Sequence, residues 1–217
     1  MNTNSPVYPI NSGAATYWQN RNALASAARQ LNERLISSDI PAHAALKIAE
    51  DLNAITATLA DLPQVSGLVE MSRRDDRGSV DNVMGELVAM AGRSHPCAPE
   101  LSWQEQKDGV TGTVVFGQAF EGPPGHAHGG WVAGILDHLM GMTHVRTGRP
   151  GMTGGLSVRY WMPTPLNTPI QVSATAKELD ERRTEVTAEM RCGTTTTATA
   201  EAIFFRVDSA QFGLDSL

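Results

Sequence analysis

Residues 122–145, GPPGHAHGGWVAGILDHLMGMTHV, decide the fold of this chain. The first part of the stretch is rich in glycine and proline, which predicts a tight turn. From Gly129 to about Val145 the spacing is helical, and apolar side chains cover almost the whole predicted helix. The apolar positions are Val132, Ile135, Leu136, Leu139 and Met140. A helix that is apolar on nearly every side is buried in a fold, so we expect other elements to surround it.

The sequence around this helix has the period of two that is typical of β-strands. Apolar and polar residues alternate over 110–116, 156–161, 170–176 and 185–190, and the segment 197–207 is rich in Thr, Ile, Phe and Val. Turn-forming residues separate the later runs at 180–182 and 192–193. We therefore predict an α+β fold, in which a curved antiparallel sheet of five to six strands wraps around one central helix.

The N-terminal part has helical spacing instead. Two apolar helix faces are predicted, one from Leu24, Ala27, Ala28, Leu31 and Leu35, the other from Ala45, Ile48, Ala49, Leu52, Ile55 and Leu59. Pro41 suits the first position of the second helix. Because both faces are apolar, we expect these helices to pack against other elements. Residues 71–78 predict a loop and residues 81–91 a short helix. We predict an N-terminal helical extension over 1–95 and a sheet domain over 96–217.

Composition excludes several classes of protein. The net charge of −6 argues against sequence-independent binding of nucleic acid, which depends on Lys and Arg. The two cysteines, Cys97 and Cys192, form no close pair, so we expect a reducing, cytoplasmic setting without disulfides. Residues 1–10 lack the pattern of a signal peptide. The most apolar stretch, residues 131–142, is too short to cross a bilayer, so we expect no membrane insertion.

The turn before the central helix is the first candidate for chemistry. Gly129 and Gly130 stand at the predicted helix N-terminus, where the first backbone N–H groups have no partner within the helix. Glycine lets a ligand approach that backbone closely, and the positive end of the helix dipole favours a developing oxyanion. The alternative is a plain glycine-rich turn between a strand and a helix.

Asp137 is the second candidate. A carboxylate in an apolar helix is costly unless it is paired or used. The alternative to a functional role is a structural acid that bonds His138, His144 or a nearby hydroxyl. Eight residues separate Gly129 from Asp137, which corresponds to about 12 Å along one helix. One substrate carbonyl cannot contact both in a single subunit, so a shared site requires a second chain.

These residues resemble a known family. His128-Gly129-Gly130, Asp137 nine residues after the histidine and Thr153 sixteen after the aspartate resemble hotdog-fold thioesterases of the PaaI and THEM type. The stretch from Met152 to Tyr160, followed by Pro163-Thr-Pro165, is similar to the family's Thr-x-x-Leu-x-x-x-Tyr…Pro-x-Pro pattern. The resemblance covers about half of the chain, residues 96–207. The N-terminal helices are similar in kind to the extension of THEM-type members.

The resemblance implies a hotdog fold and the hydrolysis of acyl-coenzyme A (acyl-CoA) thioesters. It implies that the Gly129 amide donates to the thioester carbonyl and that His128 orients it. Asp137 of the partner chain would attack the carbonyl or activate a water, and Thr153 would hydrogen-bond the acid or the water. Further residues expected to contact substrate are Gly130, His126, Gly154 and Arg159. No separate cofactor is implied, and the assembly would be a homodimer or a pair of dimers.

Several alternatives stay open at this stage. His126 competes with His128 for the role beside the carbonyl, and His138 is an unexpected neighbour for the acid. The histidines do not have the spacing of metal ligands, so we expect no metal site. Arginines at 146, 149, 159, 182 and 183 are candidates for phosphate binding or plain surface charges. The other functions considered are a non-catalytic acyl-CoA-binding module and an enzyme acting on acyl-carrier-protein thioesters.

Overall fold

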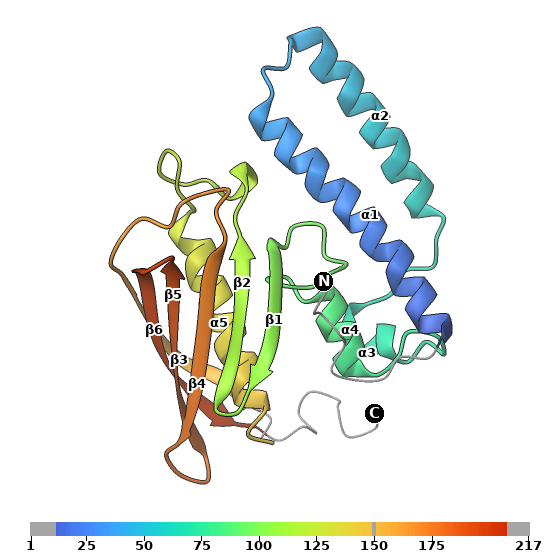
Figure 1. Cartoon of the computed structure of the whole chain (residues 1–217). Coiled ribbons are helices and arrows are strands. Elements are labelled where there is room, and N and C mark those ends of the chain that lie inside the picture. Colours follow the sequence, from blue (N-terminus) through green and yellow to red (C-terminus); the bar gives the residue numbers. More distant parts are fainter. Residues whose placement is uncertain (1–11, 149–150, 208–217) are drawn as a thin grey trace.

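The computed structural model describes residues 12–148 and 151–207 of the 217-residue chain (Figure 1). The expectations for residues 1–10 and for Arg149 therefore lie outside the described residues. In the described part, helices α1 to α4 precede a sheet that covers one long helix, α5. The division between residues 95 and 96 stays a prediction.

The six strands form one antiparallel sheet with the order β1-β2-β4-β5-β6-β3. Their bounds are Glu100–Gln106 (β1), Gly109–Val115 (β2), Gly151–Tyr160 (β3), Ile170–Glu178 (β4), Arg183–Cys192 (β5) and Thr195–Arg206 (β6). The single-turn 3-10 helix η1 (Gln118–Phe120) and then α5 (Gly129–Val145) stand between β2 and β3. The predicted α+β class, the period-two strands and the strand number are confirmed.

Helix α5 packs against the inner face of the sheet and forms the core with it. Ile135, Leu136, Leu139 and Met140 are fully buried there. The strands meet the helix with small and β-branched side chains, among them Ala174, Ala188, Ala198, Ala200 and Ala202, with Val172 and Val186. Alanine at these positions leaves the space that the larger helix residues fill. The predicted burial of this helix is confirmed.

Strand β3 forms one edge of the sheet and is largely uncovered in a single chain. Met152, Leu156 and Tyr160 on the strand are 53%, 39% and 53% exposed, and Trp161 and Met162 just after it are each 53% exposed. An edge strand also presents backbone N–H and C=O groups that no neighbouring strand pairs. The strand therefore offers an apolar surface with open hydrogen-bonding positions.

The N-terminal helices differ from the sequence-based expectation. The first two, α1 (Ser12–Ser37) and α2 (Ala42–Ala60), run antiparallel and extend beyond the sheet (Figure 1). The predicted packing of an apolar face is wrong for α2, whereas α1 does pack, but through a different face from the one predicted. Leu24 on α1 is 62% exposed, Ile55 on α2 is 59% exposed, and α2 contains no buried residue. Helix α1 instead buries Ala14, Trp18 and Ala25 and docks through polar side chains.

Smaller differences concern helix limits. Pro41 is the N-cap of α2 rather than its first residue. The expected loop at 71–78 begins later, because α3 covers Gly67–Ser72, and the short helix α4 covers Val80–Leu87. Ser79 caps α4 in a reciprocal pair of hydrogen bonds with Asn82. Such a cap fixes the start of a helix that its apolar pattern leaves undefined.

Candidate active site

The loop before α5 is held at both ends. Within it, the Gly122 amide donates to the His126 carbonyl (2.9 Å), and the His126 amide donates to the Pro123 carbonyl (2.9 Å). The Ala127 amide donates to the Thr164 carbonyl over 2.8 Å, which ties the loop to the segment after β3. Gly125 has φ +75°, a left-handed conformation that glycine adopts without steric cost. The turn is therefore fixed by its backbone.

His128 caps the N-terminus of α5. Its Nδ1 accepts a hydrogen bond of 3.0 Å from the Gly130 amide. An accepting Nδ1 carries no proton, so a neutral imidazole in this position is protonated on Nε2. The cap occupies the Gly130 N–H. For the Gly129 N–H, in contrast, no acceptor lies among the residues that the structure describes. Of the two predicted glycines, Gly129 thus has the N–H available to a ligand.

Tyr160 contacts the same helix terminus from the far end of β3. Its hydroxyl donates to the Gly129 carbonyl oxygen over 2.9 Å, and its ring lies 3.4 Å from the position that a Cβ on Gly129 would take. Tyr160 is part of the family's sequence pattern, but no role was predicted for it from the sequence. Its position on the inward face of β3, in step with Leu156 and Val158, was the available signal.

Asp137 lies in the middle of α5 and is held by Thr153. Thr153 Oγ1 donates to Asp137 Oδ1 over 3.0 Å. Thr153 stands at the start of β3, beside an irregularity of the strand between Thr153 and Gly155. The predicted contact between the acid and this hydroxyl is present.

His138 follows the acid and has a strongly altered pKa. Burial penalises the charged imidazole and lowers the pKa of His138 to about 4, although the negative charge of Asp137 opposes this shift. His138 is therefore neutral near pH 7. His126 has a different environment, because its Nδ1 donates to the Pro124 carbonyl over 2.8 Å within the loop. His126 is partly buried, whereas His128 is exposed at the helix start.

The other predicted substrate-contact residues are spread along β3. Gly154 lies at the strand irregularity, where a Cβ would stand 2.2 Å from the Phe205 ring. Arg159 lies near the opposite end of the strand, with its guanidinium 5.0 Å from the Trp161 ring centre. Two further arginines are engaged elsewhere: Arg146 pairs with Glu105 (3.4 Å) and Arg183 with Asp180 (2.8 Å). Within the described ranges, no group of three potential ligands could hold a metal ion.

The structure thus forms two separate groups in one chain. His128, Gly129, Gly130 and Tyr160 lie at the N-terminus of α5, and Asp137, Thr153 and Gly154 lie about 12 Å further along the helix. No recorded contact joins the two groups. A single substrate carbonyl can contact both groups only if they come from two different chains.

Comparison with known proteins identifies this region. Residues 124–199, which include all of the candidate site residues, match the sequence profile of the thioesterase superfamily. This segment belongs to the thioesterase superfamily. Its sheet around α5 is the hotdog fold of that group, as the sequence predicted.

Two relatives add to this comparison. The acyl-coenzyme A thioesterase THEM4 of Xenopus laevis is 31% identical over 75 residues, which are 35% of this chain and 34% of that protein. The chain thus matches about a third of the length of this curated relative. A crystal structure of a thioesterase superfamily protein is 27% identical, with a TM-score of 0.70, and covers 85% of this chain and 94% of its own. That likeness reaches past the thioesterase segment into the N-terminal helices.

None of the helices in the described residues has the length and apolar character needed to cross a bilayer.

Proposed function

We propose that this protein hydrolyses acyl-CoA thioesters to a free acid and coenzyme A. The carrying observation is that one helix, α5, presents the Gly129 N–H without an acceptor and, eight residues later, a carboxylate held by Thr153. Membership of the segment in the thioesterase superfamily and the likeness to THEM4 support this reaction and this class of substrate. Coenzyme A enters as part of the substrate, so the reaction uses no separate cofactor.

The Asp137 carboxylate acts in one of two ways. As a general base it takes a proton from a water whose oxygen attacks the thioester carbon. As a nucleophile it attacks that carbon itself and forms an anhydride, which water then hydrolyses. In both cases the carbonyl oxygen becomes an oxyanion, which the Gly129 N–H stabilises. The oxyanion then collapses and the C–S bond breaks, which releases coenzyme A as a thiolate. The thiolate takes a proton from the protonated Asp137 in the general-base route and from water in the nucleophilic route.

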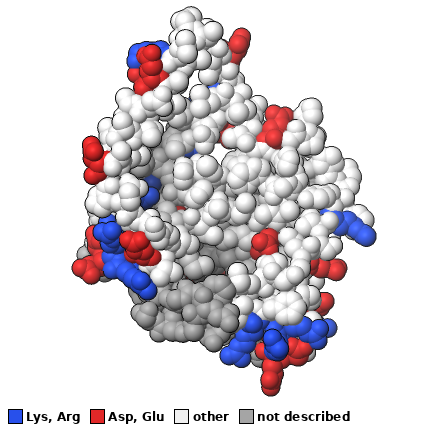
Figure 2. Space-filling model, turned by 180° about the vertical axis from the view of Figure 1, so that it is seen from behind, with Lys and Arg blue, Asp and Glu red and all other residues white. Residues whose placement is uncertain are grey.

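The complete site belongs to a homodimer. Two identical edge strands related by a twofold axis pair antiparallel, so pairing through β3 brings the start of one strand towards the end of its partner. Thr153 and Asp137 of one protomer then approach the partner's Tyr160 and the partner's Gly129. The exposed apolar side chains of β3 support this edge as the interface. Seen from the side of α5, the protein also has a broad central surface with few charged side chains (Figure 2), as interface cores do.

The two cysteines support a reducing compartment, which we take to be the cytoplasm. Cys97 is exposed, Cys192 is partly buried, and both are free thiols. An exposed free thiol persists best where glutathione and thioredoxin keep it reduced.

A panel of acyl-CoAs with different chain lengths tests the reaction through release of free thiol. The wild-type protein is expected to hydrolyse at least one of them. Asp137→Asn is expected to bind the same acyl-CoA and to lower kcat by about a thousandfold or more, because it removes both the base and the nucleophile. Equal rates for the two proteins would exclude Asp137 from the mechanism. Tight binding of acyl-CoA without turnover by wild type would identify a binding module instead.

Two further measurements separate the remaining alternatives. Release of thiol only from acyl-carrier-protein thioesters would move the substrate class to carrier proteins. Sedimentation at several concentrations distinguishes a dimer from a pair of dimers, and a monomer that retains full activity would contradict the shared site.

A further inference from the structure

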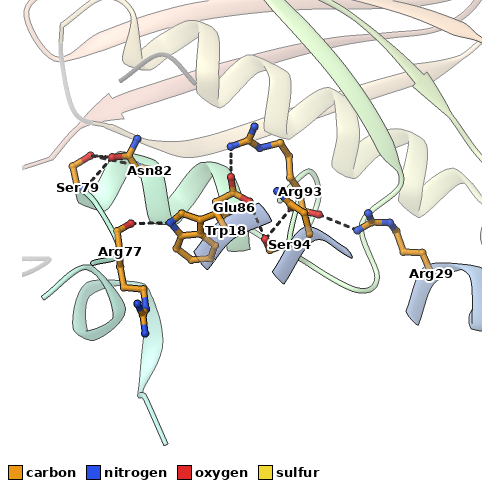
Figure 3. Close-up of polar contacts among 9 residues, drawn as sticks. Trp18, Arg29, Arg77, Ser79, Asn82, Glu86, Arg93 and Ser94 are labelled. Carbon is orange, nitrogen blue, oxygen red and sulfur yellow. Dashed lines mark hydrogen bonds and ion pairs between the residues drawn. The ribbon is translucent and has the colours of Figure 1, made fainter. Parts of the chain in front are cut away.

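Helix α1 of the N-terminal extension docks through one polar face. Asn22, Arg29, Asn32 and Glu33 lie on this face at helical spacing. Arg29 Nη1 donates to the carbonyl oxygens of Arg93 (3.1 Å) and His95 (3.0 Å), and Ser94 Oγ donates to Asn22 (2.9 Å). Figure 3 shows the contact of Arg29 with the backbone of Arg93, which attaches α1 to the connector between α4 and β1. These hydrogen bonds, together with the buried cluster of Ala14, Trp18 and Val83, hold α1 in place.

Glu33 extends this face towards the loop that precedes α5. Its Oε2 accepts from the Gln118 amide over 2.8 Å, and its Oε1 accepts from the Ala119 amide over 3.2 Å. These amides are the first two of the 3-10 helix η1, where backbone N–H groups lack partners within the helix. A carboxylate that accepts both supplies charge-assisted hydrogen bonds. Glu33 thus acts as a cap for η1, provided by an element 85 residues earlier in the chain.

Gly117 makes room for this carboxylate. A Cβ at Gly117 would stand 2.3 Å from Glu33 Oε1 and 2.5 Å from Glu33 Cδ, closer than atoms approach without bonding. The backbone of Gly117, with φ −81°, is one that any residue adopts. Glycine at this position therefore leaves space for the carboxylate beside η1, and a Cβ here would force the Glu33 side chain to move.

The segment that Glu33 holds contacts the candidate site directly. The carbonyl of Phe120, the last residue of η1, accepts from the His128 amide over 2.8 Å. The Phe120 ring packs edge-to-face on Trp131 in the first turn of α5, with ring centres 4.9 Å apart. The path from Glu33 to His128 consists of hydrogen bonds at both ends of η1, joined by the backbone of this three-residue helix. It ends at the residue that caps α5 beside the Gly129 N–H.

We infer that Glu33 is a positioning residue for the turn 128–130, through which the N-terminal extension sets the direction of the Gly129 N–H. The inference rests on the proposed function, because it assigns that N–H to the reaction. The carboxylate fixes η1, η1 fixes the His128 backbone, and His128 fixes the first turn of α5. A donor that is displaced or mobile stabilises the transition state less, while substrate binding elsewhere is unaffected.

Two variants test this path from opposite sides. Glu33→Gln retains the size of the side chain but offers only one accepting oxygen. Gly117→Ala keeps the carboxylate and forces it away from η1. Each is expected to lower kcat by about tenfold and to change KM by less than about twofold, since the loss affects transition-state stabilisation. The double variant is expected to be no worse than either single one, because both break the same contact. Glu50→Gln, an exposed change on α2, is the matched control and should behave as wild type.

Hydrogen exchange provides a readout that does not depend on activity. In both variants the amides of His128 and Gly130 are expected to exchange faster than in wild type, together with the directly bonded amides of Gln118 and Ala119. Faster exchange confined to Gln118 and Ala119, with unchanged kcat, would overturn the inference and leave Glu33 a local structural contact. An inactive wild type would contradict the proposed function alone, because exchange at His128 and Gly130 still decides whether Glu33 controls the turn. Thermal unfolding of each variant shows whether the measurement is made on folded protein.

Discussion

Thr153 Oγ1 donates a 3.0 Å hydrogen bond to Asp137 Oδ1, and this bond joins the start of an edge strand to the middle of the buried helix. It orients one oxygen of the carboxylate. The other oxygen, Oδ2, has no donor among the residues that the structure describes. The acid therefore combines a fixed orientation with one oxygen free to contact a substrate or a water.

Thr153→Val is expected to reduce turnover without unfolding the protein. The change keeps the β-branched shape but removes the hydroxyl, and a hydrogen bond to a charged group contributes about 1.5–3 kcal/mol. If that contribution is expressed in the transition state, kcat falls by about 10- to 100-fold. Steady-state kinetics with the best acyl-CoA measure the effect. Thr153→Ser, which keeps the hydroxyl, is the control, and a similar loss in both variants would exclude the hydrogen bond as the cause.

Two substitutions at His128 separate capping from chemistry. Asparagine is a good N-cap and alanine is a poor one, so His128→Ala is expected to lose about 1 kcal/mol of unfolding free energy and His128→Asn much less. If the imidazole also orients the carbonyl, both variants lose activity. Urea unfolding and kcat are measured together. A His128→Asn protein with wild-type kcat would show that the side chain serves only as a cap.

Tyr160→Phe removes one hydroxyl next to the Gly129 carbonyl. The ring contact with Gly129 stays, so only the 2.9 Å hydrogen bond is lost. We expect kcat to fall by about three- to tenfold with little change in KM, as for a neutral hydrogen bond worth about 1 kcal/mol. Kinetics of the purified protein provide the measurement. An increase in KM alone would instead make Tyr160 a substrate contact.

The lowered pKa of His138 predicts that the free energy of unfolding decreases in mild acid. Its pKa is about 4 in the folded protein and about 6.5 when unfolded, so between these values the unfolded state binds the additional proton. The stabilising contribution is complete above about pH 6.5 and is lost as the pH falls towards 4, at a rate of about 1 kcal/mol per pH unit. Urea unfolding at several pH values, compared with His138→Gln, isolates this slope. Parallel curves for both proteins would contradict the prediction.

Arg93 compensates a carboxylate that is fully buried. Glu86 is 0% exposed and receives hydrogen bonds from Arg93 and from Ser94 Oγ (Figure 3). Arg93→Ala leaves that carboxylate without its cation, which we expect to cost about 3 kcal/mol of unfolding free energy. Lys47→Ala, which breaks the exposed Lys47–Asp51 pair, is the control and is expected to cost less than about 1 kcal/mol. Chemical unfolding of both variants tests the difference.

The sequence was sufficient for the sheet and the central helix, because both follow from residue periods that burial imposes. The Thr153–Asp137 contact was also predictable, since it depends on a spacing shared with related proteins. The contacts of Tyr160 and Glu33 were not. Each joins elements far apart in the chain, and neither leaves a local pattern. The face predicted for α1 was wrong for a related reason. The side of that helix that docks combines buried Ala14 and Trp18 with polar side chains that bond backbone carbonyls, and such a mixed face has no apolar period to find in the sequence.

The place of β3 in the sheet has a consequence for how the protein matures. Its neighbour within the chain is β6, which is synthesised after β3, β4 and β5. A chain that ends before residue 195 would contain every candidate site residue, from His126 to Tyr160, and no partner strand to hold Thr153 against Asp137. During translation, we therefore expect the contact between Thr153 and Asp137 to form only after β6 has been synthesised, well after every candidate site residue is present in the chain.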